Sequence, residues 1–273
     1  AGTQVYTCTP YSGWSGVKVA VDFRYYKGMI SEGLYKRIYK ACGSWWTDDP
    51  DPTVMFDAPP EACKELLEDP FVPVESVAGD TDNMGGGYYI YDTCSADMLA
   101  EAAGAEFPND AGEYACGQEA ASLKWLNLPE VQKAVHVKVV APDTEFSFFG
   151  NFYHYNYTAL SLLPQYKAQL LPNFRILQFS GDSDPCVPYV GTKRWIDSLD
   201  MPVSRPWHPW GPSSTTVAGY SETYAGEGLG SSFTFTTIRN AGHMVPRYKP
   251  AEAFHMIRTF LADNSSAPVS VVV

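Results

Sequence analysis

The sequence predicts an α/β fold. In the second half of the chain, strand-like and helix-like segments alternate, and each of the two strand-like segments runs directly into a polar loop. Open α/β sheets carry their chemistry in such loops, at the carboxyl ends of the strands. The chain has 273 residues, of which 45% are hydrophobic and 18% charged, so it can bury a substantial core.

The first half of the chain predicts fewer regular elements. An apolar run at residues 17–23 leads into a helix-like stretch, and the hydroxyl of Ser31 can cap that helix. Residues 43–95 are rich in Asp, Pro and Gly, which is typical of an irregular surface lobe, with a short helix predicted at residues 59–67. We therefore expect residues 1–120 to form the start of the chain and an inserted, cap-like lobe.

The second half begins with an amphipathic helix at residues 128–136, which has Pro129 in its first turn and apolar residues on one face. Residues 174–179 then have the clustered apolar side chains of a strand, and residues 192–199 have helical spacing. We expect residues 121–273 to form the ordered core of the fold.

A second strand and a final helix complete this pattern. Residues 232–238 alternate apolar and polar side chains as a strand does. Residues 250–261 follow as a helix with proline in its first turn. The inward face of this helix is predicted to consist of Ala253, Phe254, Ile257, Phe260 and Leu261.

The charge of the chain argues against nucleic acid as a partner, and its hydrophobic pattern argues against a membrane. The formal net charge is −12, and the acidic residues are scattered through the sequence. Nothing resembles the basic stripe that neutralises nucleic-acid phosphates. No run approaches the roughly 20 apolar residues of a membrane helix. We expect neither nucleic acid nor a membrane as a partner.

The six cysteines indicate an oxidising compartment rather than a metal site. None stands in a Cys-x-x-Cys pair or has a histidine at zinc-finger spacing, so we expect no metal and no other cofactor. Asn156 and Asn264 each begin an Asn-x-Ser/Thr sequon, which accepts glycans in the secretory pathway. Together these features favour a secreted glycoprotein, or one of the vacuole or lysosome.

Spacing suggests part of the disulfide pattern. Cys42 and Cys63 would form one pair and Cys94 and Cys116 another, which leaves Cys8 and Cys186 unassigned. Sequence alone does not fix the connectivity.

Two residues in the polar loops form a candidate catalytic pair. Asp184 lies in the loop after the first predicted strand, and His243 in the loop after the second. The order Asp then His is that of the last two members of a Ser, Asp, His triad on an α/β sheet. In such a triad the histidine takes a proton from a hydroxyl, and the carboxylate fixes its tautomer. The alternative is an ordinary turn aspartate, which accepts backbone hydrogen bonds.

The residues around this pair resemble a known family. Residues 179–188 are Phe-Ser-Gly-Asp-Ser-Asp-Pro-Cys-Val-Pro, and residues 241–246 are Ala-Gly-His-Met-Val-Pro. These words resemble the segments that carry the catalytic Asp and His of serine carboxypeptidases. The resemblance begins near Val17 and is strongest after Ala121. It implies the C-terminal part of an α/β-hydrolase sheet with an irregular, partly helical inserted lobe.

The resemblance also implies roles for single residues. Asp184 would orient the catalytic His243, with Asp182 as structural support. Met244 would line the pocket for the leaving residue of the substrate, although a buried, flexible apolar filler is an equal alternative. Cys186 lies near the expected site, either as a free thiol that contacts substrate or in a disulfide.

The nucleophile expected of this family is missing from the sequence. Neither Gly-x-Ser-x-Gly nor Gly-Glu-Ser-Tyr occurs, and Ser15, Ser213 and Ser221 lack the required flanking residues. Three explanations stand: a second chain that carries the serine, a truncated sequence, or a degenerate homologue. This chain alone is therefore expected to be inactive, because a triad works as a unit.

The resemblance implies a hydrolase of the serine protease type. The complete protein is expected to release C-terminal residues from peptide substrates through an acyl-enzyme. An acyltransferase or a hydroxynitrile lyase on the same scaffold is the first alternative. A secreted, inactive protein that binds peptides is the second.

Overall fold

A computed structural model describes residues 14–43, 60–67, 88–91, 118–136, 162–226, 232–262 and 269–272. The chain divides into two compact units, of which the smaller comprises residues 82–85 and 92–158. Its described helices are α5 (Gln118–Leu126) and α6 (Pro129–Ala134). Helix α6 has proline at its start and confirms a helix within the predicted residues 128–136, but none of its residues is buried and Val135 is 54% exposed, so the predicted apolar face is not packed among the described residues.

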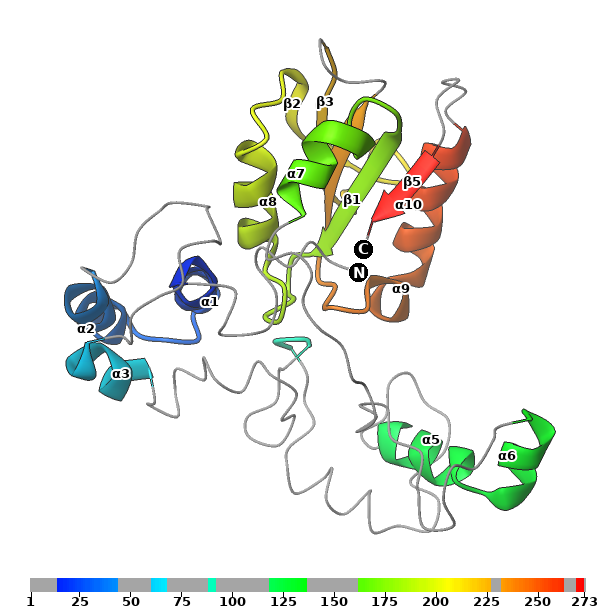
Figure 1. The fold of residues 1–273 in the computed structure, drawn as a ribbon, viewed down its shortest axis with the longest axis horizontal. Coiled ribbons are helices and arrows are strands. Elements are labelled where there is room, and N and C mark those ends of the chain that lie inside the picture. The colour runs from blue at the N-terminus through cyan, green and yellow to red at the C-terminus, as the bar shows by residue number, and fades with distance from the viewer. Residues whose placement is uncertain are drawn as a thin grey trace. The chain divides into compact units, whose positions relative to one another are not determined.

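A five-stranded mixed sheet forms the centre of the larger unit (Figure 1). The spatial order of the strands is β2-β3-β4-β1-β5, and β1 runs parallel to both β4 and β5, whereas β2, β3 and β4 are antiparallel neighbours. With helices packed on it, this is the predicted α/β fold. The strands are β1 (Arg175–Gly181), β2 (Val203–Trp210), β3 (Gly219–Tyr224), β4 (Phe233–Ile238) and β5 (Val269–Val272).

The hairpin β2–β3 was not among the predicted elements. Strand β2 contains Pro206 and Pro209, and proline cannot donate a ladder hydrogen bond. A strand at the edge of a sheet tolerates this loss, because its outer side has no neighbour to pair with. The pairing of β2 with β3 also shifts register twice. The residues predicted as strands, in contrast, match β1 and β4.

Two helices cover opposite faces of the sheet (Figure 1). On one face, α8 (Tyr189–Asp197) places Trp195 in a core cluster with Ile176. On the other face, α10 (Pro250–Ala262) packs Met256 in a cluster with Leu177. Ile176 and Leu177 are successive residues of β1, and successive side chains of a strand point to opposite faces. Both faces of β1 are therefore buried.

The predicted inward face of α10 was partly wrong. Phe254 is 68% exposed and Leu261 is 57% exposed. The buried residues are Ala253, Met256 and Phe260, which follow the spacing of three and four that keeps side chains on one helical face. Phe254 lies one residue, or about 100°, away from this stripe, and Leu261 lies two turns further on the same line as Phe254.

Smaller elements connect these layers. Helix α7 (Leu163–Gln165) continues into the π-helical turn η2 (Tyr166–Leu170) ahead of β1, and α9 (Val245–Tyr248) lies between the loop after β4 and α10. Tyr166 packs its ring 5.2 Å from that of Trp195. In the described part of the chain, no helix is both long and apolar enough to span a bilayer.

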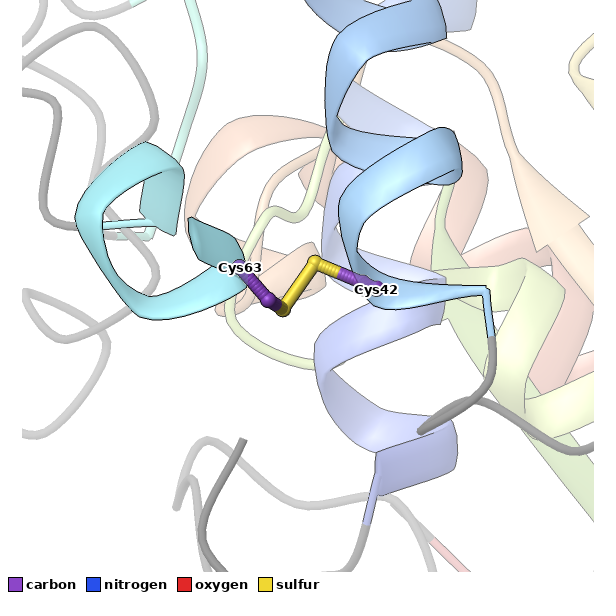
Figure 2. Close-up of a disulfide and its surroundings, with 2 residues drawn as sticks. All are labelled: Cys42 and Cys63. Atoms are coloured by element: carbon purple, nitrogen blue, oxygen red, sulfur yellow. A yellow bond between two sulfur atoms is a disulfide. The ribbon is translucent and has the colours of Figure 1, made fainter. Parts of the chain in front are cut away.

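The N-terminal helices are α1 (Trp14–Tyr26), α2 (Glu32–Cys42) and α3 (Glu61–Leu67). The hydroxyl of Ser31 accepts the N–H of Leu34 at 3.3 Å, which confirms the predicted cap. A disulfide joins Cys42 at the end of α2 to Cys63 in α3, as the spacing suggested (Figure 2). The other suggested pair and both sequons lie outside the described residues.

A buried carboxylate connects α1 to α2 and α8. Asp22 of α1 accepts hydrogen bonds from the hydroxyls of Tyr35, at 3.0 Å, and Tyr39. It also pairs with Arg194 of α8 at 3.1 Å and with Lys18 at 3.4 Å. Burial is the main cause that raises the pKa of Tyr35 to about 12. Asp22 thus connects the N-terminal helices to the helical layer that covers the sheet.

Candidate active site

The two candidate catalytic residues follow the carboxyl ends of two neighbouring strands in the interior of the sheet. Strands β1 and β4 are parallel neighbours, paired from Ile176 opposite Phe233 to Gly181 opposite Ile238. Their carboxyl ends therefore lie side by side. The loop after β1 carries Asp184, and the loop after β4 carries His243. This is where open α/β sheets place their functional side chains.

Asp184 and His243 form a hydrogen-bonded pair. The Nδ1 atom of His243 lies 3.0 Å from Oδ2 of Asp184, while Oδ1 of Asp184 accepts the backbone N–H of Cys186 at 2.8 Å. Asp184 is buried, at 3% exposure, whereas the side chain of His243 is 38% exposed. A buried carboxylate thus holds an imidazole whose far edge can meet a substrate.

The pair also sets the chemistry of the imidazole. An ionised carboxylate only accepts hydrogen bonds, so Nδ1 of His243 carries the hydrogen and Nε2 is left as the basic nitrogen. The hydrogen bond to Asp184 is the main cause that raises the pKa of His243 above its ordinary value, and burial opposes it. No other described residue forms a hydrogen bond with the imidazole. This is the arrangement of a general base whose tautomer is fixed.

Asp182 holds the two loops together without contacting the imidazole. Its carboxylate accepts the backbone N–H of Asn240 at 2.7 Å and the hydroxyl of Ser183 at 2.8 Å. Its own N–H donates to the carbonyl of Ile238 at 3.0 Å. This is the supporting position that the resemblance implied for the first aspartate of the Gly-Asp-Ser-Asp word.

Two glycines allow the loops to approach each other. A Cβ atom on Gly181 would lie 2.2 Å from the carbonyl oxygen of Ala241, and one on Gly242 would lie 2.3 Å from that of Tyr88. Both obstructing atoms belong to the backbone, so no side-chain rotation relieves the clash. Glycine at position 181 allows the Asp and His loops to approach each other, and glycine at position 242 allows the His loop to approach residues 88–91.

A short segment from the first half of the chain also contacts both loops. In residues 88–91, the carbonyl of Tyr88 accepts the N–H of His243 at 2.7 Å, and the N–H of Ile90 donates to the carbonyl of Ser183 at 3.2 Å. The ring of Tyr88 lies 5.1 Å from the imidazole. Sequence reasoning did not single out Tyr88, because backbone contacts leave no pattern in the side chains.

Comparison with known proteins accords with this geometry. A family model described as serine carboxypeptidase matches residues 12–263 of the chain. The chain belongs to this family. The mixed sheet with its helices is accordingly an α/β fold of the serine carboxypeptidase type, as the two sequence words had implied.

Several curated serine carboxypeptidase relatives match the chain. Serine carboxypeptidase II-1 of Hordeum vulgare is 30% identical over 245 residues, which are 87% of this chain and 67% of the relative. Serine carboxypeptidase-like 21 of Arabidopsis thaliana is 37% identical over 147 residues, 54% of this chain and 28% of the relative. P-(S)-hydroxymandelonitrile lyase of Sorghum bicolor is 36% identical over 151 residues, 51% of this chain and 27% of the relative. The matches thus span less than a third of the Arabidopsis and Sorghum proteins.

The two other candidate site residues have different surroundings. Met244 is 37% exposed and directly precedes α9, beside His243. Cys186 is buried and disulfide-bonded, to a partner outside the described residues, so the free thiol is the wrong one of the two alternatives. Ligand atoms of Asp184, Cys186 and His243 lie within 4.8 Å of one another. A disulfide sulfur is not a thiolate ligand, so this cluster does not fit a metal ion.

Proposed function

We propose that the complete protein is a serine-type carboxypeptidase in which His243 is the general base and Asp184 positions it. The hydrogen-bonded pair at the edge of the sheet is the observation that supports this role. His243 would take the proton of a serine hydroxyl during acylation and return a proton to the leaving amino acid. Met244, exposed beside His243, would contact that leaving residue.

The nucleophile and the oxyanion-hole donors would come from a segment outside these 273 residues, either earlier in a longer chain or in a second chain. The sequence contains no Gly-x-Ser-x-Gly word, and no serine among the described residues hydrogen-bonds to His243. The exposed edge of the imidazole, with Nε2 basic, is the side on which such a serine would have to lie.

The test is peptide hydrolysis by the full-length protein. We expect release of the C-terminal residue from N-blocked dipeptides, and we expect His243→Ala to lower kcat by several orders of magnitude. His136→Ala is the matched control, since His136 is exposed and lies in the smaller unit. Full peptidase activity in the His243 variant, or no hydrolysis of any blocked dipeptide by the wild-type protein, would contradict the proposal.

A second candidate is suggested by the Sorghum relative, whose printed name is that of a hydroxymandelonitrile lyase. The same base could deprotonate the hydroxyl of a cyanohydrin, which then releases cyanide and an aldehyde. Cyanide release from aromatic cyanohydrins, with blocked dipeptides left intact, would favour this candidate over the carboxypeptidase.

We further propose that the protein works in a secreted or vacuolar compartment. The disulfide between Cys42 and Cys63 and the bonded state of Cys186 support an oxidising environment. Glycans at Asn156 and Asn264 would accompany this location. Mass analysis of the native protein before and after glycosidase treatment tests it, and unmodified Asn156 and Asn264 with reduced cysteines would count against it.

A further inference from the structure

A cavity of about 450 Å³ lies between α10 and the face of strands β2, β3 and β4. Its lining includes neither Asp184 and His243 nor the residues that contact them. The cavity is therefore separate from the candidate active site. Its chemistry is given by the side chains that the three strands and the helix contribute.

The floor of the cavity is a ladder of hydroxyls. Ser221 stands opposite Thr236, and Thr223 opposite Thr234, in the pairing of β3 with β4. The hydroxyls of the first pair are 2.9 Å apart and those of the second 3.5 Å. Ser221 also donates to the carbonyl of Phe235, so the hydrogens of the first pair are used within the sheet. In the second pair one hydroxyl donates to the other, which leaves one hydroxyl hydrogen for a ligand.

Three basic side chains also line the cavity. Arg205 and His208 come from β2, and His255 comes from α10. Arg205 makes no ion pair with any described residue. His255 accepts or donates no hydrogen bond within the described part of the chain, and its ring lies parallel to that of Trp210, at 3° and 6.3 Å. Both side chains keep their donors available to a ligand.

Among the described residues that line this cavity none carries a carboxylate, although the chain as a whole has a net charge of −12. A site for a neutral sugar needs acceptors for the sugar hydroxyls, and the described lining contains no acidic or amide side chain. The guanidinium of Arg205 and the imidazole of His255, next to the hydroxyls of the sheet, are instead donors that bind oxygen anions, whereas the Nδ1–H of His208 is used by the carbonyl of Pro206 at 2.8 Å. The charge of the described lining is thus opposite in sign to the net charge of the chain.

We propose that this cavity binds a small molecule that carries an oxyanion group, such as a phosphate, a sulfate or a carboxylate. Arg205 holds two oxygens of the anion through its planar guanidinium. His255 and the hydroxyl pair of Thr223 and Thr234 supply the remaining donors. The site is independent of the chemistry proposed for Asp184 and His243.

Titration of the full-length protein with inorganic phosphate tests the proposal, with calorimetry for affinity and the ring signals of His208 and His255 in NMR for location. We expect phosphate to shift both signals and to leave that of His136 unchanged. Arg205→Gln should raise the Kd for phosphate at least about tenfold, because a charge-assisted hydrogen bond is lost. Sulfate and acetate, titrated in the same way, show which oxyanion geometry the site prefers.

Arg258→Gln is the matched control, since Arg258 lies on α10 with the same charge but outside the lining. An equal loss of affinity in this variant would reduce the effect to general charge attraction and overturn the proposal. So would the absence of any phosphate-induced shift at millimolar concentration, or equal binding of a neutral pyranoside. Arg205 is exposed, so its replacement should leave the melting temperature unchanged. His255→Gln provides a second variant with the same expected loss of affinity.

Discussion

The two carboxylate oxygens of Asp184 accept from different donors, one from the backbone of its own loop and one from His243. The first bond fixes where the carboxylate points, and the second passes that orientation to the imidazole. Asparagine at position 184 keeps one oxygen that can accept the backbone N–H of Cys186, but it removes the negative charge that faces His243. This substitution therefore tests the effect of the charge without removing the bond that holds the loop.

Asp184→Asn should lower the pKa of His243 towards its ordinary value, because the charge-assisted bond that raises this pKa is lost. NMR titration of the His243 ring signals in this chain measures it directly. In the complete enzyme the same change should lower kcat by on the order of 10⁴-fold, through loss of the correct tautomer. An unchanged His243 titration would show that Asp184 does not control the imidazole.

The sign of the pH dependence follows from the same pair. The general-base role proposed for His243 needs its neutral form, so the raised pKa should move the acid limb of kcat/KM to higher pH, and Asp184→Asn should move it back down. For folding the direction is opposite. The pair stabilises the folded chain fully below the pKa of an unfolded histidine, and this contribution is lost as pH rises through the raised folded-state pKa.

Gly242→Ala should destabilise the chain and disrupt the site. The new methyl would lie 2.3 Å from the carbonyl oxygen of Tyr88, which can move only if the backbone of one loop shifts. Gly33→Ala in α2 is the control, since its Cβ meets nothing within 4 Å and alanine favours a helix by up to about 1 kcal/mol. Urea unfolding should show a loss for the first variant and none for the second; equal midpoints would contradict the close approach of the loops.

At the scale of whole elements, the attachment of α1 and α2 to the sheet layer depends on Asp22. Asp22→Ala should lower the free energy of unfolding by about 3 kcal/mol, because it leaves Arg194 and two tyrosine hydroxyls without their buried acceptor. Denaturant titration followed by tyrosine and tryptophan fluorescence measures the loss.

Glu32→Gln is the matched control for this variant. Glu32 pairs with Lys36 on the exposed surface of α2, and exposed pairs contribute little to stability. A comparable loss in both variants would mean that burial of Asp22 gives it no special role.

The elements that could be predicted are those whose pattern reports burial directly. Strands β1 and β4 and helix α8 follow their hydrophobic periodicity. The hairpin β2–β3 could not be predicted in this way, since β2 is an exposed edge strand that contains two prolines. In α10 the number of apolar residues exceeds the buried stripe, and periodicity alone did not show that Phe254 faces solvent.

For the molecule as a whole, the meeting of Asp184 and His243 could be anticipated, because parallel neighbouring strands end at the same edge of a sheet. The contact with residues 88–91 could not. It consists of backbone hydrogen bonds between distant parts of the chain, and such bonds place no constraint on residue type. No Gly-x-Ser-x-Gly word occurs in these 273 residues, so no serine among them could be predicted as a nucleophile.

A fluorophosphonate probe, which labels nucleophilic serines, tests the proposal that the serine lies outside the chain that carries Asp184 and His243. We expect the 273-residue chain to remain unlabelled, since no serine in it has the flanking glycines of a nucleophile elbow. The full-length protein should take up one probe molecule, at a serine outside this chain, and mass spectrometry of the labelled peptide locates it. Stoichiometric labelling of Ser15, Ser213 or Ser221 would place the nucleophile within this chain instead.

The bond between Tyr88 and His243 has a consequence for the order of folding. It closes a loop of more than half the chain, whereas β1 and β4 are much closer in sequence. Contacts across long loops are entropically costly and slow to form unless other structure has already brought their ends together. The sheet should therefore assemble first and the backbone of His243 be fixed late, so that during refolding, native tertiary signals of the sheet precede the native titration of the imidazole.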